Sequence, residues 1–170
     1  RVFCPTKLTK EFLIRNKIFS EDKIYVVEDP IIDVKKIFLN NRDTQLTTNF
    51  DLYDKKIEYV VSIGRLTNQK NFKFLINNFE KILKNHPSLK LLILGEGEQR
   101  SMLTKIIINN KLEKNVFLIG SVDNVYPYLQ NSLFFVLTSK WEDPGFVLIE
   151  SMFAKTIVLS SDCTSGPIEI

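Results

Sequence analysis

Residues 57–95 read IEYVVSIGRLTNQKNFKFLINNFEKILKNHPSLKLLILG and place a helical pattern between two short apolar runs. Both runs end in glycine and are mainly apolar, as strands are when a sheet is covered on both faces. Between the runs, apolar side chains recur at helical spacing, at Leu75, Ile76, Phe79, Ile82 and Leu83. We therefore expect a strand, a helix that follows an N-cap at Asn71 and ends at His86-Pro87, and a second strand.

The same alternation continues to residue 160. Apolar runs at 116–120, 132–139 and 156–160 predict three more strands, and helical patterns precede them at 98–111, 123–130 and 144–154. This order is typical of an α/β fold, and we predict a doubly wound, Rossmann-like parallel sheet with helices on its faces. Ligands of such folds bind beyond the carboxyl ends of the strands, so the loops that follow the strands are the candidate site.

The N-terminal third of the chain lacks this regularity. Residues 9–18 are predicted to be helical, and residues 22–32 hold a short strand that stops at Asp29-Pro30. Residues 34–56 show no periodicity and are interpreted as a loop or linker, so we assign residues 1–56 to a preceding region and 57–170 to the α/β domain. The chain begins at Arg1 and stops after a turn-like segment, and we expect it to be a piece of a longer protein.

The composition excludes several classes of function. The chain has 170 residues, of which 44% are apolar and 25% charged, as in soluble globular domains. A net charge of +3 is too small to indicate nucleic acid, although a basic surface suits an anionic substrate or the inner leaflet of a membrane. No apolar run approaches the roughly 20 residues that span a bilayer. The cysteines, Cys4 and Cys163, favour a reduced, cytosolic compartment over a disulfide framework or a zinc site.

Several catalytic arrangements have no counterpart in the sequence. His86 is the only histidine and precedes a proline at a predicted helix end, which argues against a catalytic triad. No D-x-D pair or His/Cys/Asp cluster indicates a catalytic metal, and no phosphate-binding G-x-x-x-x-G-K-[ST] loop is present. The stretch GEGEQR, residues 95–100, starts like a dinucleotide fingerprint, but Arg100 replaces its third glycine. We interpret Gly95 and Gly97 as a tight turn between a strand and a helix.

The loop GRLTNQKN, residues 64–71, carries two cations at the ligand-binding edge of the predicted sheet. Arg65 offers a planar fork of donors and Lys70 a mobile point charge, and the pair suits a diphosphate. The alternative is a solvated basic loop with no ligand. Its position directly after a strand favours the binding interpretation.

The stretch KWEDPGFVLIESMFAK, residues 140–155, carries two glutamates eight positions apart. We expect Asp143 to cap a helix that begins at Pro144, so that the amides of Gly145 and Phe146 face an anion at the helix start. Glu150 falls among apolar residues, and we expect its helix to be packed on all sides. A buried carboxylate needs donors, which a ribose diol would supply; the alternative is a structural glutamate paired with a lysine.

Together these motifs resemble those of a known family. GRLTNQKN, LLILGEGE, VFLIGSV, EDPGFVLIE and SDCTSGPIEI, in this order, are similar to the C-terminal, nucleotide-sugar-binding domain of the GT-B glycosyltransferases of family 4 (group 1). EDPGFVLIE matches the E-x7-E motif of that family, and the resemblance covers residues 57–170. Residues 1–33 are similar to the stretch that leads out of the family's N-terminal domain. Pro144 departs from the family's usual phenylalanine and removes one possible amide donor.

The resemblance implies a role for each matching position. Glu150 would hold the ribose hydroxyls, and Glu142 would contact a hydroxyl of the donor sugar. Arg65 and Lys70 would bind the diphosphate and stabilise the charge that grows as the sugar leaves. The remaining contacts implied are amides at Gly145 and Phe146, and main chain at Ile119 and Gly120 beside the base.

The expected function follows from this resemblance. It implies a glycosyltransferase that moves a sugar, with retention, from a UDP- or GDP-linked donor to a glycan or lipid-linked acceptor in bacterial polysaccharide, lipopolysaccharide or lipid-linked glycan synthesis. It implies no metal, no cofactor and no nucleic-acid partner, and a place in the cytoplasm or at the inner face of the membrane; the fragment alone is expected to be inactive. The alternatives are a nucleotide-sugar epimerase-like enzyme and a non-catalytic nucleotide-binding module.

Overall fold

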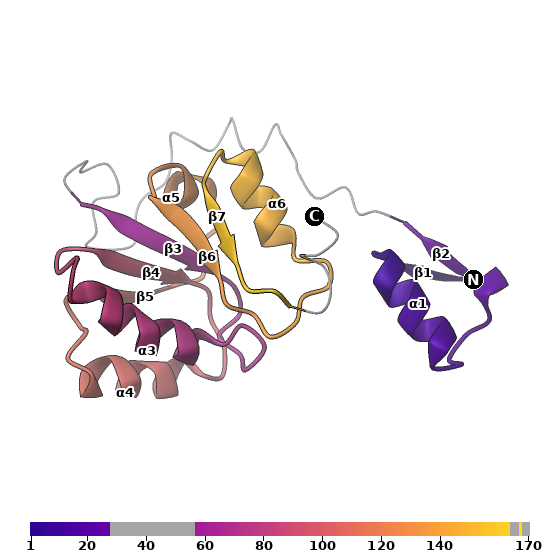
Figure 1. Ribbon diagram of the computed structural model, residues 1–170, viewed down its shortest axis with the longest axis horizontal. Helices are drawn as coiled ribbons and strands as arrows, with labels where there is room; N and C mark the ends of the chain where they lie inside the picture. The colour runs from indigo at the N-terminus through magenta and orange to yellow at the C-terminus, as the bar shows by residue number, and fades with distance from the viewer. Residues whose placement is uncertain (28–56, 164–166, 168–170) are drawn as a thin grey trace.

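A computed structural model describes residues 1–27, 57–163 and Pro167 of the chain (Figure 1). The N-terminal part contains β1 (Val2–Cys4), α1 (Lys7–Arg15), a 3-10 helix (Glu21–Lys23) and β2 (Ile24–Val26). The larger part begins with β3 (Tyr59–Ile63), α3 (Phe72–Leu83), β4 (Lys90–Leu94), α4 (Arg100–Asn109) and β5 (Val116–Gly120). It continues with α5 (Tyr126–Gln130), β6 (Phe134–Leu137), α6 (Phe146–Phe153) and β7 (Val158–Ser160).

The larger part is built on one parallel sheet. Its strand order is β5-β4-β3-β6-β7, and each neighbouring pair runs parallel. Figure 1 shows α3 and α4 on one face of this sheet and α5 and α6 on the other. The chain moves outward from β3 to β5, then returns to β6 beside β3, which reverses the direction of winding. The predicted doubly wound α/β fold is therefore confirmed.

Alternation along the central strands explains why these runs are apolar throughout. In β3, Val60 packs with α3 and α4 whereas Val61 packs with α5 and α6. In β4, Leu91 and Ile93 belong to the first cluster and Leu92 to the second. A strand with helices on both faces buries every side chain, so its sequence shows no polar half.

The helix α3 differs from its predicted limits. It ends at Leu83, before His86-Pro87, and Ile82 is 42% exposed although its spacing placed it on the buried face. Asn71 does occupy the N-cap position, but its backbone is left-handed (φ 55°) and its side chain makes no capping hydrogen bond. The predicted cap position is confirmed, whereas the helix end and the burial of Ile82 were wrong.

The N-terminal part has two elements that the sequence did not reveal, the 3-10 helix and β1. The strand β1 is three residues long and pairs in parallel with β2, the strand predicted within residues 22–32. The helix α1 begins after Thr6, whose hydroxyl accepts a hydrogen bond from the amide of Thr9 at 3.1 Å. The described residues do not include Asp29-Pro30 or the predicted linker 34–56, so the domain boundary near residue 57 stays a prediction. They also do not include Gly166 and Glu169 of the last motif.

Glycines lie at or directly after the ends of three adjacent strands. Gly64 donates its amide to the carbonyl of Leu94 at 2.9 Å, and Gly95 donates to the carbonyl of Gly120 at 2.7 Å. A Cβ atom on Gly95 would lie only 2.1 Å from the carbonyl oxygen of Gly64, and the φ of Gly95 is +132°. The ends of β3 and β4 can therefore approach this closely only because position 95 has no side chain.

Gly95→Ala is expected to lower the free energy of unfolding by at least about 2 kcal/mol. The added methyl group would collide with backbone, which cannot rotate away as a flexible side chain can. Urea unfolding followed by circular dichroism measures the change, with Ser101→Ala on the exposed surface of α4 as the matched control. Equal unfolding midpoints for the two variants would show that the strand ends have room that the structure does not reveal.

Candidate functional site

The candidate site lies where the direction of winding reverses, at the carboxyl ends of β3 and β6. These two strands are neighbours in the sheet but are separated by more than seventy residues of chain, for example at the pair Val60–Phe134. The loops that follow them leave the sheet on the same edge. In doubly wound folds this edge is where ligands bind.

Hydrogen bonds join these two loops directly. The hydroxyl of Thr138 donates to the carbonyl of Lys70 at 3.0 Å, and the amide of Lys140 donates to the carbonyl of Gln69 at 2.8 Å. The side-chain amide of Gln69 donates in return to the carbonyl of Trp141 at 2.9 Å. The loop that follows β6 thus holds the backbone of Lys70 in place. We call residues 65–71 the β3 loop and residues 138–145 the β6 loop.

Lys70 and Glu142 form an ion pair across these loops. Lys70 Nζ donates to Glu142 Oε1, and Ser139 Oγ donates to the same oxygen. The side chains of Lys70 and Glu142 are only 14% and 6% exposed, so little water remains to solvate either charge. The stem of Lys70 lies over Gly64, where a Cβ atom would be 2.8 Å from Lys70 Cε. Glu142 lies in the loop before α6, and its contact with Lys70 was not predicted.

Arg65 precedes Lys70 by five positions and lies in a different environment. Its side chain is exposed, and no ion pair or hydrogen bond to it occurs among the described residues. It lines a cavity of about 270 Å³ at the ends of β3, β4 and β5. The cavity is also lined by Ile63, Gly64, Leu94, Gly95, Glu96, Ser121, Val122 and Val125. Arg65 is therefore a cation at the mouth of a cavity with its donors available.

The predicted main-chain contacts at Ile119 and Gly120 lie beside this cavity. Gly120 is buried with φ +94°, and the next residue, Ser121, lines the cavity. Ile119 packs instead on the apolar cluster beneath α5 and α6. Ser121, the end of the main-chain stretch expected beside the base, is the member of that stretch that lines the cavity.

The GEGEQR stretch forms the predicted turn between β4 and α4. A Cβ atom on Gly97 would lie 2.5 Å from the carbonyl oxygen of Leu66. That carbonyl accepts the amide of Gln99 at 3.0 Å, and the amide of Leu66 donates to Glu96 at 2.9 Å. Gly97 is therefore explained by a close approach of this turn to the protein's own β3 loop.

The start of α6 differs from the prediction. The helix begins at Phe146, with Gly145 as a left-handed N-cap (φ 90°, ψ 47°), so the expected start at Pro144 and cap at Asp143 were wrong. The carboxylate of Asp143 instead accepts a hydrogen bond from Thr9 Oγ1 of α1 at 2.8 Å. A Cβ atom on Gly145 would lie 3.4 Å from Glu142 Cβ. The helix start and the Lys70–Glu142 ion pair are therefore adjacent.

Glu150 is the less buried of the two glutamates. It is half-buried in α6, and Phe146, Met152 and Phe153 of that helix are 37%, 47% and 38% exposed. The expectation that α6 is packed on all sides was therefore wrong for the described residues. Burial raises the pKa of Glu150, and no ion pair or hydrogen bond to its side chain occurs in the described part. No lysine of residues 1–27 or 57–163 pairs with Glu150, as the alternative of a structural lysine partner would require.

Tyr126 of α5 is a neighbour of Glu150 that the sequence did not indicate. Burial raises the pKa of the Tyr126 phenol, and the negative charge of Glu150 raises it further. Tyr126 also makes an edge contact with Phe153, with ring centroids 6.4 Å apart. Val125, which directly precedes Tyr126, lines the cavity at the strand ends. Glu150 is therefore linked to the cavity wall through its neighbour Tyr126.

Glu150→Gln is expected to stabilise the ligand-free chain at neutral pH, by about 1–3 °C in melting temperature. Because the pKa of Glu150 is higher in the folded chain, there is a pH range in which folded Glu150 is protonated and unfolded Glu150 is ionised. Stability therefore falls as pH rises from the unfolded pKa through the folded one, and it stays lower above that window. Glutamine carries no such penalty, so the gain is present at pH 7 and disappears near pH 4.

Thermal melts between pH 4 and pH 8 measure this difference, with the exposed Glu113→Gln as the matched control. A variant that is less stable than wild type at pH 7 would show that Glu150 has a stabilising partner.

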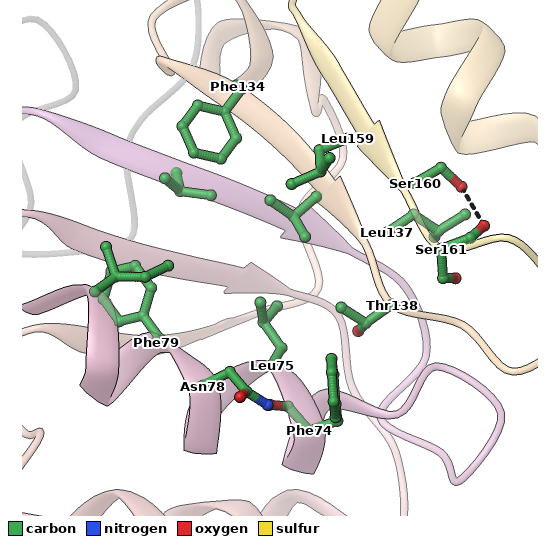
Figure 2. A pocket seen from close by; sticks show the side chains of 13 residues that line it. Phe74, Leu75, Asn78, Phe79, Phe134, Leu137, Thr138, Leu159, Ser160 and Ser161 are labelled. Atoms are coloured by element: carbon green, nitrogen blue, oxygen red, sulfur yellow. Dashed lines mark hydrogen bonds between the residues drawn. The ribbon is translucent and has the colours of Figure 1, made fainter.

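A second cavity, of about 330 Å³, lies on the opposite face of the sheet, between α3 and the strands β6 and β7 (Figure 2). Phe74, Leu75 and Phe79 line it from α3, and Leu159 from β7. None of its lining residues carries a charge. It offers no cation to pair with a phosphate, so the charged edge at the strand ends remains the candidate site.

Comparison with known proteins identifies the family. The family described as Glycosyl transferases group 1 matches residues 47–170, which is more than half of the chain. The chain belongs to the group 1 glycosyl transferases. The resemblance drawn from EDPGFVLIE and its companion motifs is thus confirmed at the level of the family.

Relatives of known sequence include an uncharacterized glycosyltransferase and a glycosyltransferase whose name gives its acceptor. An uncharacterized glycosyltransferase of Methanocaldococcus jannaschii is 40% identical over 110 residues, which make up 65% of this chain and 27% of that protein. The N-acetylgalactosamine-N,N'-diacetylbacillosaminyl-diphospho-undecaprenol 4-alpha-N-acetylgalactosaminyltransferase of Campylobacter jejuni is 36% identical over 160 residues, 94% of this chain and 40% of that enzyme. The chain spans less than half the length of these relatives.

Solved structures of similar fold confirm the architecture. TarM of S. aureus, in complex with Fondaparinux, alpha-GlcNAc-glycerol and UDP, has a TM-score of 0.77 at 25% identity. The match covers 99% of this chain and 31% of TarM. HepE of Anabaena, in complex with UDP and glucose, has a TM-score of 0.73 at 16% identity over 99% of this chain and 46% of HepE. The sheet of this group 1 glycosyl transferase is therefore one half of a GT-B fold.

Two further features of this group 1 glycosyl transferase concern membranes and metals. Within residues 1–27 and 57–163, no helix combines the length and the apolar character needed to cross a membrane. In the same ranges, no three His, Cys, Asp or Glu side chains gather into a group that could hold a metal ion.

Proposed function

We propose that this chain is the donor-binding part of a glycosyltransferase that moves a sugar from a nucleoside diphosphate to a hydroxyl acceptor. The observation that carries the proposal is the pair of cations in the β3 loop, at the switch point of the sheet. Arg65 faces a cavity without a partner among the described residues, and Lys70 is held across the end of β3. The names of the relatives, which are glycosyltransferases of glycan assembly, support this assignment.

The cavity at the strand ends is proposed to receive the nucleoside. It joins glycine backbone at three strand ends with the small side chains of Ser121, Val122 and Val125. A planar base can approach such a surface closely because few side chains stand in the way. Glu150 is proposed to accept hydrogen bonds from the ribose hydroxyls, which would satisfy a carboxylate that burial disfavours.

The diphosphate is proposed to lie between Arg65, Lys70 and the start of α6. The first amides of a helix have no acceptor within the helix, and they favour an anion. Negative charge grows on the diphosphate as the sugar departs, so fixed cations stabilise the transition state more than the ground state. We propose that these groups serve in place of a metal ion or a further cofactor.

The biological setting is proposed to be the assembly of a polysaccharide, lipopolysaccharide or lipid-linked glycan, with retention at the anomeric carbon. The Campylobacter jejuni relative acts, by its name, on a diphospho-undecaprenol acceptor, and structurally similar HepE holds UDP and glucose. By analogy we propose a cytoplasmic protein that meets its acceptor at the inner face of the membrane. Arg65 and Lys70 would bind the same diphosphate whatever sugar it carries.

Calorimetric titration of the chain with UDP, GDP, ADP and their nucleosides tests the proposal. One diphosphate is expected to bind at least 10-fold more tightly than its nucleoside, because charge-assisted bonds are each worth about 1.5–3 kcal/mol. Glu150→Gln is expected to weaken that binding while stabilising the free chain. If every diphosphate binds no better than its nucleoside, the two cations do not form a diphosphate site.

Sugar transfer is to be assayed with the whole protein, using the donor whose nucleotide binds. Nucleotide binding without transfer to any glycan or lipid-linked acceptor would favour a non-catalytic nucleotide-binding module.

A further inference from the structure

Glu142 is the most buried acidic side chain of the candidate site, and its surroundings define what it does in the ligand-free protein. The residue as a whole is 4% exposed. Its Oε1 accepts from Lys70 Nζ and from Ser139 Oγ, and Ser139 is itself 3% exposed. An isolated carboxylate in such a position would be strongly disfavoured, and the ammonium group of Lys70 offsets the cost of burying its charge.

Cys163, which follows β7, is a neighbour of Glu142. Burial raises the pKa of the nearby Cys163 thiol, and the negative charge of Glu142 raises it further. Ser161, two residues before Cys163, donates its hydroxyl to the carbonyl of Ser139 at 2.7 Å. The carboxylate is therefore enclosed from the β7 side as well as from the β3 loop.

The same ion pair fixes the position of Lys70. The lysine stem crosses Gly64 at the end of β3, and a lysine with four rotatable bonds would otherwise occupy many conformations. Its backbone carbonyl is held by Thr138, so both ends of the residue are anchored on the β6 loop. Anchoring the ammonium group in advance reduces the entropy lost when it binds an anion.

We propose that Glu142 is a positioning residue that holds Lys70 as its counterion until the diphosphate arrives. This inference rests on the proposed function, because it requires Lys70 to bind the diphosphate. It assigns Glu142 a partner within the protein, and the contact to a donor-sugar hydroxyl implied by the family resemblance stays untested. The negative charge of Glu142 weakens the attraction of Lys70 for an anion, while its oxygen keeps the ammonium group in place.

Glu142→Gln separates these two effects. Glutamine keeps an oxygen that can accept from Lys70 and Ser139 but removes the charge. We expect the variant to bind UDP and inorganic pyrophosphate about 3- to 10-fold more tightly than wild type, with uridine affinity unchanged. The gain is expected to vanish when Lys70 is also replaced, so that Glu142→Gln/Lys70→Met binds both anions as Lys70→Met does. Glu113→Gln, at an exposed position, is the matched control.

Urea unfolding of the same variants gives a second measurement that does not depend on ligand. Lys70→Met leaves a buried carboxylate without its counterion, so adding Glu142→Gln is expected to recover part of the lost stability. A double variant that is less stable than Lys70→Met would contradict the counterion role.

The outcomes of the binding experiment separate this inference from the proposed function. If Lys70→Met weakens UDP and pyrophosphate binding but Glu142→Gln does not strengthen it, or strengthens it equally without Lys70, the positioning role is wrong and the diphosphate site stands. If the wild-type chain binds neither UDP, GDP, ADP nor pyrophosphate, both are wrong.

Discussion

Lys70→Met is expected to lower the affinity for the bound nucleoside diphosphate by about 100-fold and the free energy of unfolding by about 3–5 kcal/mol. The affinity falls because a cation fixed at the end of β3 is lost from the diphosphate site. The stability falls because Glu142, with a side chain only 6% exposed, loses the counterion Lys70 and keeps the hydrogen bond from Ser139. Calorimetry with the diphosphate and urea unfolding measure the two effects separately.

The control for this variant is Lys140→Met on the neighbouring β6 loop. Lys140 is exposed, and its ammonium group contacts only the side chain of Asn68 among the described residues, at 2.6 Å. Exposed pairs of this kind contribute little to stability, so the control should resemble wild type in both measurements. Equal stability of the Lys70 and Lys140 variants would show that Glu142 is compensated by something other than Lys70.

Arg65→Ala is expected to weaken diphosphate binding by about 10- to 100-fold and to leave nucleoside binding nearly unchanged. The guanidinium can donate two parallel bonds to phosphate oxygens, which a nucleoside does not offer. Stability should stay within about 0.5 kcal/mol of wild type, because the side chain is exposed and has no partner among the described residues. This combination of lost affinity and kept stability distinguishes Arg65 from Lys70.

Titrations of the Arg65 variant with a diphosphate, its monophosphate and its nucleoside measure this selectivity. Arg15→Ala on the exposed surface of α1 serves as the control. An equal loss for all three ligands would place Arg65 against the nucleoside, and no loss at all would remove it from the site.

The architecture was predictable because its strands are buried on both faces. Val60 and Val61 point to opposite helix layers yet both must be apolar, so the strand stands out as a continuous run. The three-residue strand β1 offered no such run and was missed. The end of α3 was misplaced because helical spacing continues through Ile82 although the packing does not.

The candidate site was predictable only in part. The β3 loop could be placed from sequence, since two cations after a buried strand must lie at the ligand-binding edge of the sheet. Glu150 was expected to be buried and is half-buried, whereas the deeper burial of Glu142 was not predicted, because burial depends on partners far away in the chain. Lys70 and Glu142 are 72 residues apart, and no local sequence pattern predicts their contact. The local signal at Asp143 was also misleading, since its carboxylate is engaged by Thr9.

The bonds between the β3 and β6 loops have a consequence for exchanging parts between related enzymes. Thr138, Lys140 and Trp141 meet Lys70 and Gln69 mainly through backbone atoms, so the match depends on where each segment turns and how long it is. If residues 65–71 alone were transplanted from another family member, the new loop would lack the β6 loop with which its hydrogen bonds match, and its cations would be misplaced. A chimera built to swap donor preference therefore has to carry residues 138–145 along as one cassette.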